Sequence, residues 1–246
     1  MNQISTLSLA LSLLAGTLVP GFGALADEMK HQPRAVLELF TSQGCTSCPP
    51  ADKLLAAYDG RTDIIALAYH VDYWDYIGWR DSFGSTANSD LQRAYAKAQN
   101  KTRIYTPQLL VNGTRDVVGS RSSEVKAAVG DAVLPVPVTL VANDDMLEVR
   151  IDAKADLGEF VVWLVKFRKQ AAVEIERGEL AGQTLDYSQI VTGRQVLGMW
   201  EPGAGAHIKL PLSEVLGAES DGAAILVQED LNGLPGRIIG AASFQR

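Results

Sequence analysis

The chain has 246 residues, of which 47% are hydrophobic, enough for a packed core in one or two domains. It carries 22 Lys and Arg against 29 Asp and Glu, a formal net charge of -7. This mildly acidic balance excludes the basic footprint of a nucleic-acid-binding protein and the polybasic patch of a membrane-surface protein.

The first 26 residues predict a signal peptide. They carry no charged side chain, and Ala24-Leu25-Ala26 has the A-x-A form of a cleavage site, although the residues Met1-Asn2-Gln3 lack the usual positive charge. A proline and two glycines between positions 20 and 23 leave the apolar run too short and broken for a good membrane span. We therefore expect a periplasmic or secreted protein without a membrane span, whose two cysteines meet an oxidising compartment.

Residues 33–134 alternate between strand and helix patterns. The apolar run at 35–41 predicts a strand, and the apolar spacing over 51–58 after the two cysteines predicts a helix. The run at 64–70 is almost entirely apolar, as expected of a strand buried on both faces.

A second helix, a hairpin and a third helix follow. Ser89 and Gln92 match a capping box at the start of the second helix. Asn112-Gly113 lies between two short apolar runs and predicts a β-hairpin, and an apolar stripe over 125–133 predicts the last helix. The order β-α-β-α-β-β-α is the minimal layout of the thioredoxin fold, so we predict a thioredoxin-like α/β domain over residues 33–134.

Beyond a short proline-containing linker at 134–137, the pattern changes to short strands separated by turns, with no convincing helix. Such punctuation predicts an all-β, sandwich-like domain over residues 137–246. The expected strands are 138–142, 146–153, 160–168, 171–176, 195–200, 207–211, 223–228 and 238–244.

The pair Cys45 and Cys48 is the strongest chemical signal. At a junction of strand and helix, the first sulfur lies at a helix N-terminus, where free N–H groups and the helix dipole stabilise a thiolate. Cys45 would attack a disulfide and Cys48, one turn further on, would resolve the mixed disulfide. Structural zinc requires four ligands, whereas the chain has only two cysteines. The pattern favours dithiol chemistry but leaves a metal site and an inert disulfide open.

Two further segments are expected beside the cysteines. Thr106-Pro107 opens the hairpin at the edge where the parallel strands end, so we predict a cis peptide bond there, next to Cys45. His70 and Asp72 follow the second strand at the same edge. The imidazole could stabilise the thiolate or move protons, although packing and a solvated rim are equally common roles for such residues.

At these residues the chain resembles the thioredoxin-like superfamily. It is similar, more specifically, to a family of uncharacterised secreted bacterial proteins with the signature F-T-S-Q-G-C-x-S-C-P-P-A-D, found here at 40–52. The segments H-V-D-Y-W-D at 70–75 and R-G-E at 177–179 match as well. The resemblance implies a thioredoxin-like fold with a β-rich C-terminal domain.

Residue roles carried over by this resemblance make Cys45 the nucleophile, Cys48 the resolving thiol and Pro107 the cis-proline that faces the substrate. Thioredoxins bury an acid beneath the active site, and Glu38 is its nearest counterpart here. Buried with a raised pKa, Glu38 would accept the proton of Cys48.

These observations predict an exported thiol–disulfide oxidoreductase that acts on protein or small-molecule disulfides without an organic cofactor. Its Cys45 sulfur should then be accessible to solvent. One alternative is a copper-binding protein in which Cys45, Cys48 and His70 hold Cu(I). The other is a binding module whose Cys45–Cys48 bridge is only structural.

Overall fold

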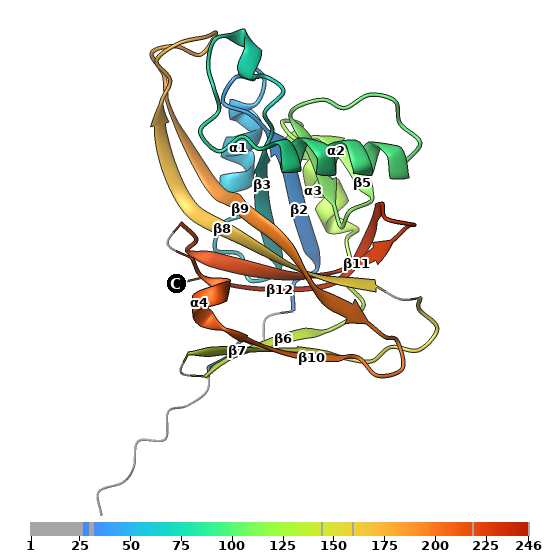
Figure 1. Ribbon diagram of the computed structural model, residues 1–246. Helices are drawn as coiled ribbons and strands as arrows, with labels where there is room; N and C mark the ends of the chain where they lie inside the picture. Colours follow the sequence, from blue (N-terminus) through green and yellow to red (C-terminus); the bar gives the residue numbers. More distant parts are fainter. Residues whose placement is uncertain (1–26, 30–31, 144, 159, 218, 246) are drawn as a thin grey trace, which may run out of the picture.

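The computed structural model describes residues 27–29, 32–143, 145–158, 160–217 and 219–245 (Figure 1). The predicted signal peptide, residues 1–26, lies outside these ranges. No helix within the described ranges is both long and apolar enough to cross a membrane.

From β2 onward the first part of the chain has the predicted order of strands and α-helices, while the strand β1 and the 3-10 helix η1 were not predicted. Its elements are β1 (Asp27–Met29), β2 (Ala35–Thr41), α1 (Pro49–Ala56), β3 (Ile64–His70), the 3-10 helix η1 (Asp75–Ile77), α2 (Thr86–Ala98), β4 (Gln108–Val111), β5 (Arg115–Val118) and α3 (Ser122–Gly130). The predicted hairpin is confirmed, because Asn112 and Gly113 join β4 to β5 with φ values of 49° and 72°. Two successive positive φ angles favour Asn-Gly at such a turn.

The start of α2 differs from the prediction. The N-cap is Ser85, whose side chain accepts a hydrogen bond from the Asn88 backbone N–H, so the helix begins one turn before the expected capping box. Ser89 and Gln92 are therefore inside the helix and buried. Their polar side chains are free to bind other segments.

The second part of the chain is rich in strands. Its elements are β6 (Val138–Asn143), β7 (Met146–Ile151), β8 (Phe160–Glu174), β9 (Thr184–Trp200), β10 (Ala206–Pro211), α4 (Leu212–Val215), β11 (Gly222–Asp230) and β12 (Pro235–Gln245). Two expectations were wrong here: the strands 160–168 and 171–176 form one strand, β8, and the strand expected at 195 begins at Thr184 as β9. The short helix α4 also occurs where we predicted none.

Two sheets organise the described residues (Figure 1). The larger has eight strands in the order β12-β11-β8-β9-β3-β2-β4-β5, with β2 and β3 parallel and β4 antiparallel to β2. The smaller contains β1, β6, β7 and β10. It packs against the β8, β11 and β12 part of the larger sheet through a shared apolar core that includes Leu140, Val149, Phe160 and Ile225.

Strand alternation assigns the side chains of β2 and β3 to two different cores. Leu37 and Leu39 pack with residues of α1 and α3 on one face of the sheet. Val36 and Phe40 face the other way and pack with Tyr95 of α2. The cysteine pair lies at the start of α1, beside the carboxyl ends of β2 and β3, on the edge where the site was expected.

Strands from both predicted domains belong to the larger sheet. β3 and β9 are linked at the pair Ala68↔Ile190, and the core on the α2 side includes Val165, Phe167 and Leu226 from the second part of the chain. The division into residues 33–134 and 137–246 stays a prediction. Its two ranges share a sheet and a core.

Candidate functional site

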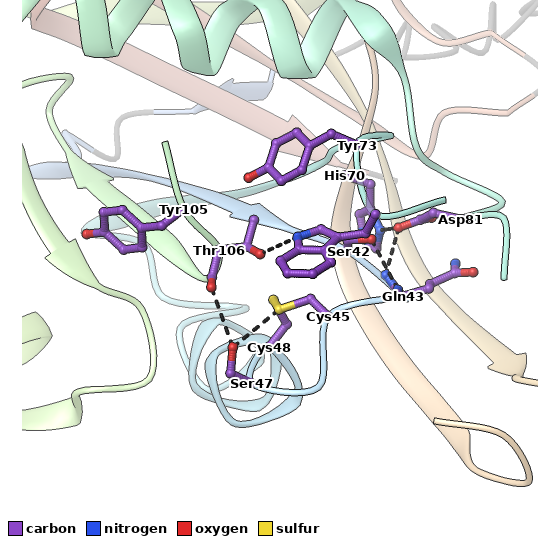
Figure 2. Close-up of a disulfide and its surroundings, with 12 residues drawn as sticks. Ser42, Gln43, Cys45, Ser47, Cys48, His70, Tyr73, Asp81, Tyr105 and Thr106 are labelled. Carbon is purple, nitrogen blue, oxygen red and sulfur yellow. Dashed lines mark hydrogen bonds and ion pairs between the residues drawn. A yellow bond between two sulfur atoms is a disulfide. The ribbon is translucent and has the colours of Figure 1, made fainter. Parts of the chain in front are cut away.

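Cys45 and Cys48 form a disulfide at the N-terminal end of α1 (Figure 2). A tight turn precedes the helix: the Cys45 N–H donates to Ser42 O and the Cys48 N–H donates to Cys45 O, both at 3.1 Å. Cys48 is the N-cap, and the two prolines after it occupy the first helical turn, where their missing N–H groups cost little. The Cα atoms of the two cysteines are 5.4 Å apart, an ordinary separation for a bridge.

Both cysteines are buried, which contradicts our expectation of an accessible sulfur. Cys45 is 2% exposed and Cys48 is 0% exposed. Trp74 packs on the turn before Cys45, because its Cβ lies 3.1 Å from the position that a Cβ on Gly44 would occupy. Across the site, the Trp74 indole N–H donates to Thr106 Oγ1 at 2.8 Å. Trp74 therefore bridges the turn before Cys45 to the segment before β4.

Thr106-Pro107 is a cis peptide bond, as predicted. It also lies beside the cysteine turn, because Ser47 Oγ donates to Thr106 O at 3.5 Å and contacts Cys45 Sγ at 3.4 Å (Figure 2). The two sequence signals, far apart along the chain, thus meet at one edge of the sheet.

Glu38 is buried but lies on the wrong face to serve Cys48. Its Oε2 accepts a 2.6 Å hydrogen bond from the Tyr95 hydroxyl of α2, whereas its neighbours Leu37 and Leu39 face α1. Burial raises the pKa of Glu38, and the Tyr95 hydroxyl partly offsets that rise. The direction of this shift follows from burial, while the expected role beneath Cys48 is wrong because strand alternation turns Glu38 away from α1.

Asp52 is the buried acid on the α1 side, and it was missed in the sequence. It lies one helical turn after Cys48, on the same helix face, and is 6% exposed. Burial raises the pKa of Asp52 to about 6, while the nearby His70 lowers it. The signal was present in the spacing of Cys48 to Asp52, which is i to i+4 along a predicted helix.

His70 is fully buried and fixed by a second residue that the sequence did not reveal. Its Nδ1 lies 2.8 Å from Asp81 Oδ2, so Nδ1 carries the proton that the carboxylate accepts. Asp81 also accepts a 2.8 Å hydrogen bond from the backbone N–H of Gln43 (Figure 2) and another, also of 2.8 Å, from that of Phe83. Asp81 thus ties His70 to the turn before Cys45.

Asp72 is hydrogen-bonded to α2. Its carboxylate accepts hydrogen bonds from the hydroxyls of Ser89 and Thr86, each at 2.5 Å. The Ser89 hydroxyl, followed by that of Thr86, lowers the pKa of Asp72. This explains the buried Ser89 and gives Asp72 a structural contact with α2, while its expected role beside the dithiol stays a prediction.

Among the residues that the structure describes, no group of three or more His, Cys, Asp and Glu side chains is placed to hold a metal ion. The hydrogen bond that orients the His70 imidazole is made with Asp81, and not with a cysteine sulfur. The copper alternative, which needs Cys45, Cys48 and His70 together, gains no support from this arrangement.

Comparisons with known proteins give relatives of this chain but no described activity. Residues 36–228 match a family described as a protein of unknown function, DUF1223. Protein AGR_C_4864 from Agrobacterium tumefaciens, a crystal structure, is 34% identical with a TM-score of 0.77, over 87% of this chain and 95% of that one.

HBP35 of Porphyromonas gingivalis has a TM-score of 0.54 over 87% of this chain and 75% of that one. At 14% identity, this likeness concerns the fold alone. No curated protein matches the chain.

Proposed function

The chain belongs to the DUF1223 family of proteins of unknown function, and we propose that it is an exported thiol–disulfide oxidoreductase with a thioredoxin-like first half. One observation carries the proposal: the Cys45–Cys48 bridge begins α1 directly beside the cis Thr106-Pro107 bond. The order β2-α1-β3-α2-β4-β5-α3 and the neighbouring strands β3-β2-β4-β5 support the thioredoxin-like assignment. Export is proposed from residues 1–26.

The proposed reaction transfers two electrons between two thiols and a disulfide. The Cys45 thiolate attacks one sulfur of a substrate disulfide, which forms a mixed disulfide and releases the first substrate thiolate. The Asp52 carboxylate then accepts the proton of the Cys48 thiol. The Cys48 thiolate attacks Cys45 Sγ, the Cys45–Cys48 bond forms, and the second substrate sulfur leaves with its electron pair. Asp52 returns its proton to a substrate thiolate, and the second proton comes from solvent.

Access to the bridge requires a movement of the segment Tyr73–Ile77. In the oxidised protein both cysteines are buried, and Trp74 joins the turn before Cys45 to Thr106 by a hydrogen bond, so we assign the cover to this segment. A substrate disulfide can approach Cys45 only when this contact opens. Covered sites of this kind are opened by loop motions.

Replacing the nucleophile tests the proposal. Cys45→Ser should abolish reduction of a model protein disulfide in the presence of a thiol reductant, because no thiolate remains to attack. Thr46→Ser, at an exposed position between the cysteines, is the matched control and should retain turnover. Undiminished turnover in Cys45→Ser would overturn the redox assignment.

The burial of both cysteines favours a second candidate, a binding module whose bridge is structural. The reduction potential separates the two functions. Catalytic CxxC pairs lie at roughly -120 to -270 mV, whereas structural disulfides lie below about -300 mV. A bridge that resists dithiothreitol while the protein remains folded would favour the binding module.

A further inference from the structure

A cavity of about 470 Å³ opens on the α2 side of the larger sheet, and no residue of the cysteine site lines it. Strands β8 and β9 form its floor, α2 forms one wall, and the end of the β11–β12 hairpin forms the other. The helix contributes Ala87, Leu91 and Ala94, which are spaced so that they share one face of α2. The volume is that of an ordinary small-molecule site.

Exposed apolar side chains gather around this cavity. Val196 of β9 lines it and is 53% exposed, and the exposed Met199 is paired with Val161, another lining residue. The exposed Leu231 follows the lining residue Asp230 in the turn between β11 and β12. Single exposed apolar side chains are common on protein surfaces, whereas a group of them around a cavity indicates a binding site.

Arg194 is the only cation among the described residues that line the cavity. Its guanidinium carbon lies 3.3 Å from the centre of the Trp163 ring, so the planar group is stacked on the indole. Its Nη2 donates to Gln228 Oε1 at 2.7 Å. These two contacts hold the guanidinium in one position at the floor of the cavity.

Gln228 is itself fixed from the core side. Its buried Nε2 donates to the Tyr95 hydroxyl at 2.6 Å and to Gly236 O at 3.0 Å. Because a carbonyl oxygen can only accept, the amide nitrogen must face Gly236, which leaves Oε1 for Arg194. The Tyr95 hydroxyl donates in turn to Glu38 Oε2. The buried Glu38 therefore ends a chain of hydrogen bonds that orients Arg194.

Arg194 has donors and a charge that these contacts leave unused. A guanidinium carries five N–H groups, and Gln228 accepts from one of them. The Arg194 Nε is buried and finds no acceptor among the residues that the structure describes. The arginine ion pairs in the same part of the chain do not include Arg194, and Glu38 is separated from it by two side chains. A fixed, planar and unpaired guanidinium is suited to a carboxylate.

The acids at the mouth of the cavity set a limit on the ligand. Asp90 and Asp230 are exposed and Glu229 is partly exposed, so all three stand toward solvent. Asp90 pairs with Arg93 at 2.8 Å and Glu229 with Arg237 at 3.6 Å. A second carboxylate at the outer end of a ligand would meet these acids and be repelled. The charges therefore favour a ligand with one carboxylate, held at the floor.

We propose that this cavity binds a small monocarboxylate with an apolar body. The carboxylate pairs with Arg194, and the apolar body lies against Trp163, Val196 and Leu234. Three exposed apolar side chains are too few to bury the roughly 800 Å² per partner of a stable protein interface, which favours a small molecule over a second copy of the chain. The proposal is independent of the proposed function, because it uses no residue around the cysteines.

Calorimetric titration of the unaltered, oxidised protein tests the ligand class with four compounds that share one unbranched chain of eight carbons. These are octanoate, octan-1-ol, octylammonium and the dicarboxylate suberate. We expect octanoate to bind once per chain, and each of the other three to bind roughly tenfold or more weakly. Absence of saturable octanoate binding overturns the proposal. Octan-1-ol, octylammonium or suberate binding as tightly as octanoate overturns it as well.

A charge variant tests the site. Arg194→Gln keeps an amide donor but removes the charge and the planar fork, and it should weaken octanoate binding roughly tenfold or more. Arg121→Gln is the matched control, since it removes the same charge from an exposed side chain at the start of α3, and it should bind octanoate normally. Unchanged octanoate binding in folded Arg194→Gln contradicts the assignment.

A second pair of variants keeps the test decisive if Arg194→Gln does not fold. Val196→Asp places a carboxylate among the apolar lining at an exposed position and should abolish octanoate binding. Gln195→Asp adds the same charge to the neighbouring exposed residue, which points to the opposite face of β9, and should retain binding. Retained binding in both variants, or equal loss in both, overturns the proposal.

Sedimentation of the protein without ligand tests the rival occupant, a second copy of the chain. We expect the same sedimentation for the unaltered protein and Val196→Asp. A concentration-dependent dimer that Val196→Asp abolishes would assign this face to contact between copies and overturn the small-molecule site.

Discussion

The side chains of Asp52 and Glu38 differ in their access to the dithiol, although both are buried acids. Asp52 shares a helix face with Cys48, while Glu38 binds Tyr95 across the sheet on the α2 side. Burial raises the pKa of each. Position relative to the sheet, and not acidity, decides which of them can take the Cys48 proton.

Asp52→Asn should slow resolution of the mixed disulfide by roughly 10²–10⁴-fold at pH 7, because the general base is lost. In the unaltered protein the rate should rise with pH through about 6, as Asp52 loses its proton. That rise should be absent in the variant. Glu38→Gln, on the opposite face, is the control and should leave the pH profile unchanged; stopped-flow kinetics with a mixed-disulfide substrate measures both.

Asp52→Asn should also stabilise the folded protein at neutral pH. A carboxyl group whose pKa is raised on folding stabilises the protein at low pH. For Asp52 this contribution is lost as the pH rises from the pKa in the unfolded chain, about 4, through the pKa in the folded protein, about 6. Asp52→Asn removes that loss, so its free energy of unfolding at pH 7 should exceed that of the unaltered protein by about 1–3 kcal/mol. Denaturant titrations at pH 4 and pH 7 measure the difference, and a larger gain at pH 4 would contradict it.

At the scale of elements, the proposed function needs the segment Tyr73–Ile77 to move before a substrate can reach Cys45. Its contact with the Thr106 segment is the indole hydrogen bond of Trp74. Tyr76 stacks on Trp74 but is 80% exposed, so it adds little cover. Opening at Trp74 requires that this hydrogen bond break and that the indole separate from the turn at Gly44. Tyr73 and Asp75 hold the rest of the segment, because the Tyr73 hydroxyl donates to Gln92 Oε1 and Asp75 Oδ1 accepts from the Asp81 N–H.

Thr106→Val keeps the shape of the side chain and removes the acceptor of this hydrogen bond. With a net value of about 1 kcal/mol for the bond, reduction of the Cys45–Cys48 bridge by dithiothreitol should become roughly fivefold faster. Trp74→Ala, which also removes the cover, should accelerate it further, and Tyr76→Ala should change it little. Equal rates in all variants would show that access is limited elsewhere.

At the scale of the whole molecule, polar contacts run from the first half of the chain into the second. The Gln228 amide donates to the Tyr95 hydroxyl at 2.6 Å, and Tyr95 donates to Glu38, so β11, α2 and β2 share one buried chain of hydrogen bonds. The Ile238 N–H donates to Asn112 O, which ties the β4–β5 turn to β12. The two halves are thus joined well beyond the sheet pair at Ala68.

Residues 33–134 expressed alone should consequently fail to form a stable native state. Their core on the α2 side would lack Val165, Phe167 and Leu226, leaving Phe40 and Tyr69 exposed. The full chain should unfold in one cooperative transition, as followed by calorimetry and circular dichroism. A fragment with a cooperative thermal transition of its own would show that the boundary near Pro135 separates independent domains.

The order of elements in the first half was readable from local patterns. Apolar runs, helical spacing and the Asn112-Gly113 turn are local signals, and each depends on a few neighbouring residues. Tertiary contact overrode such signals elsewhere: α2 is capped by Ser85 while Ser89, inside the helix, binds Asp72, and β8 continues to Glu174 because β9 pairs along its whole length.

The sequence by itself determined the bridge-forming cysteine pair, its place at a helix start and its meeting with Thr106-Pro107, because strand order and direction bring those segments to one edge. Only the tertiary structure decided that both sulfurs are covered, that Asp52 is buried on the α1 side while Glu38 faces α2, and that Asp81 and Tyr187 hold His70. These features depend on contacts between residues far apart along the chain, and no local pattern records which face of a sheet another segment covers.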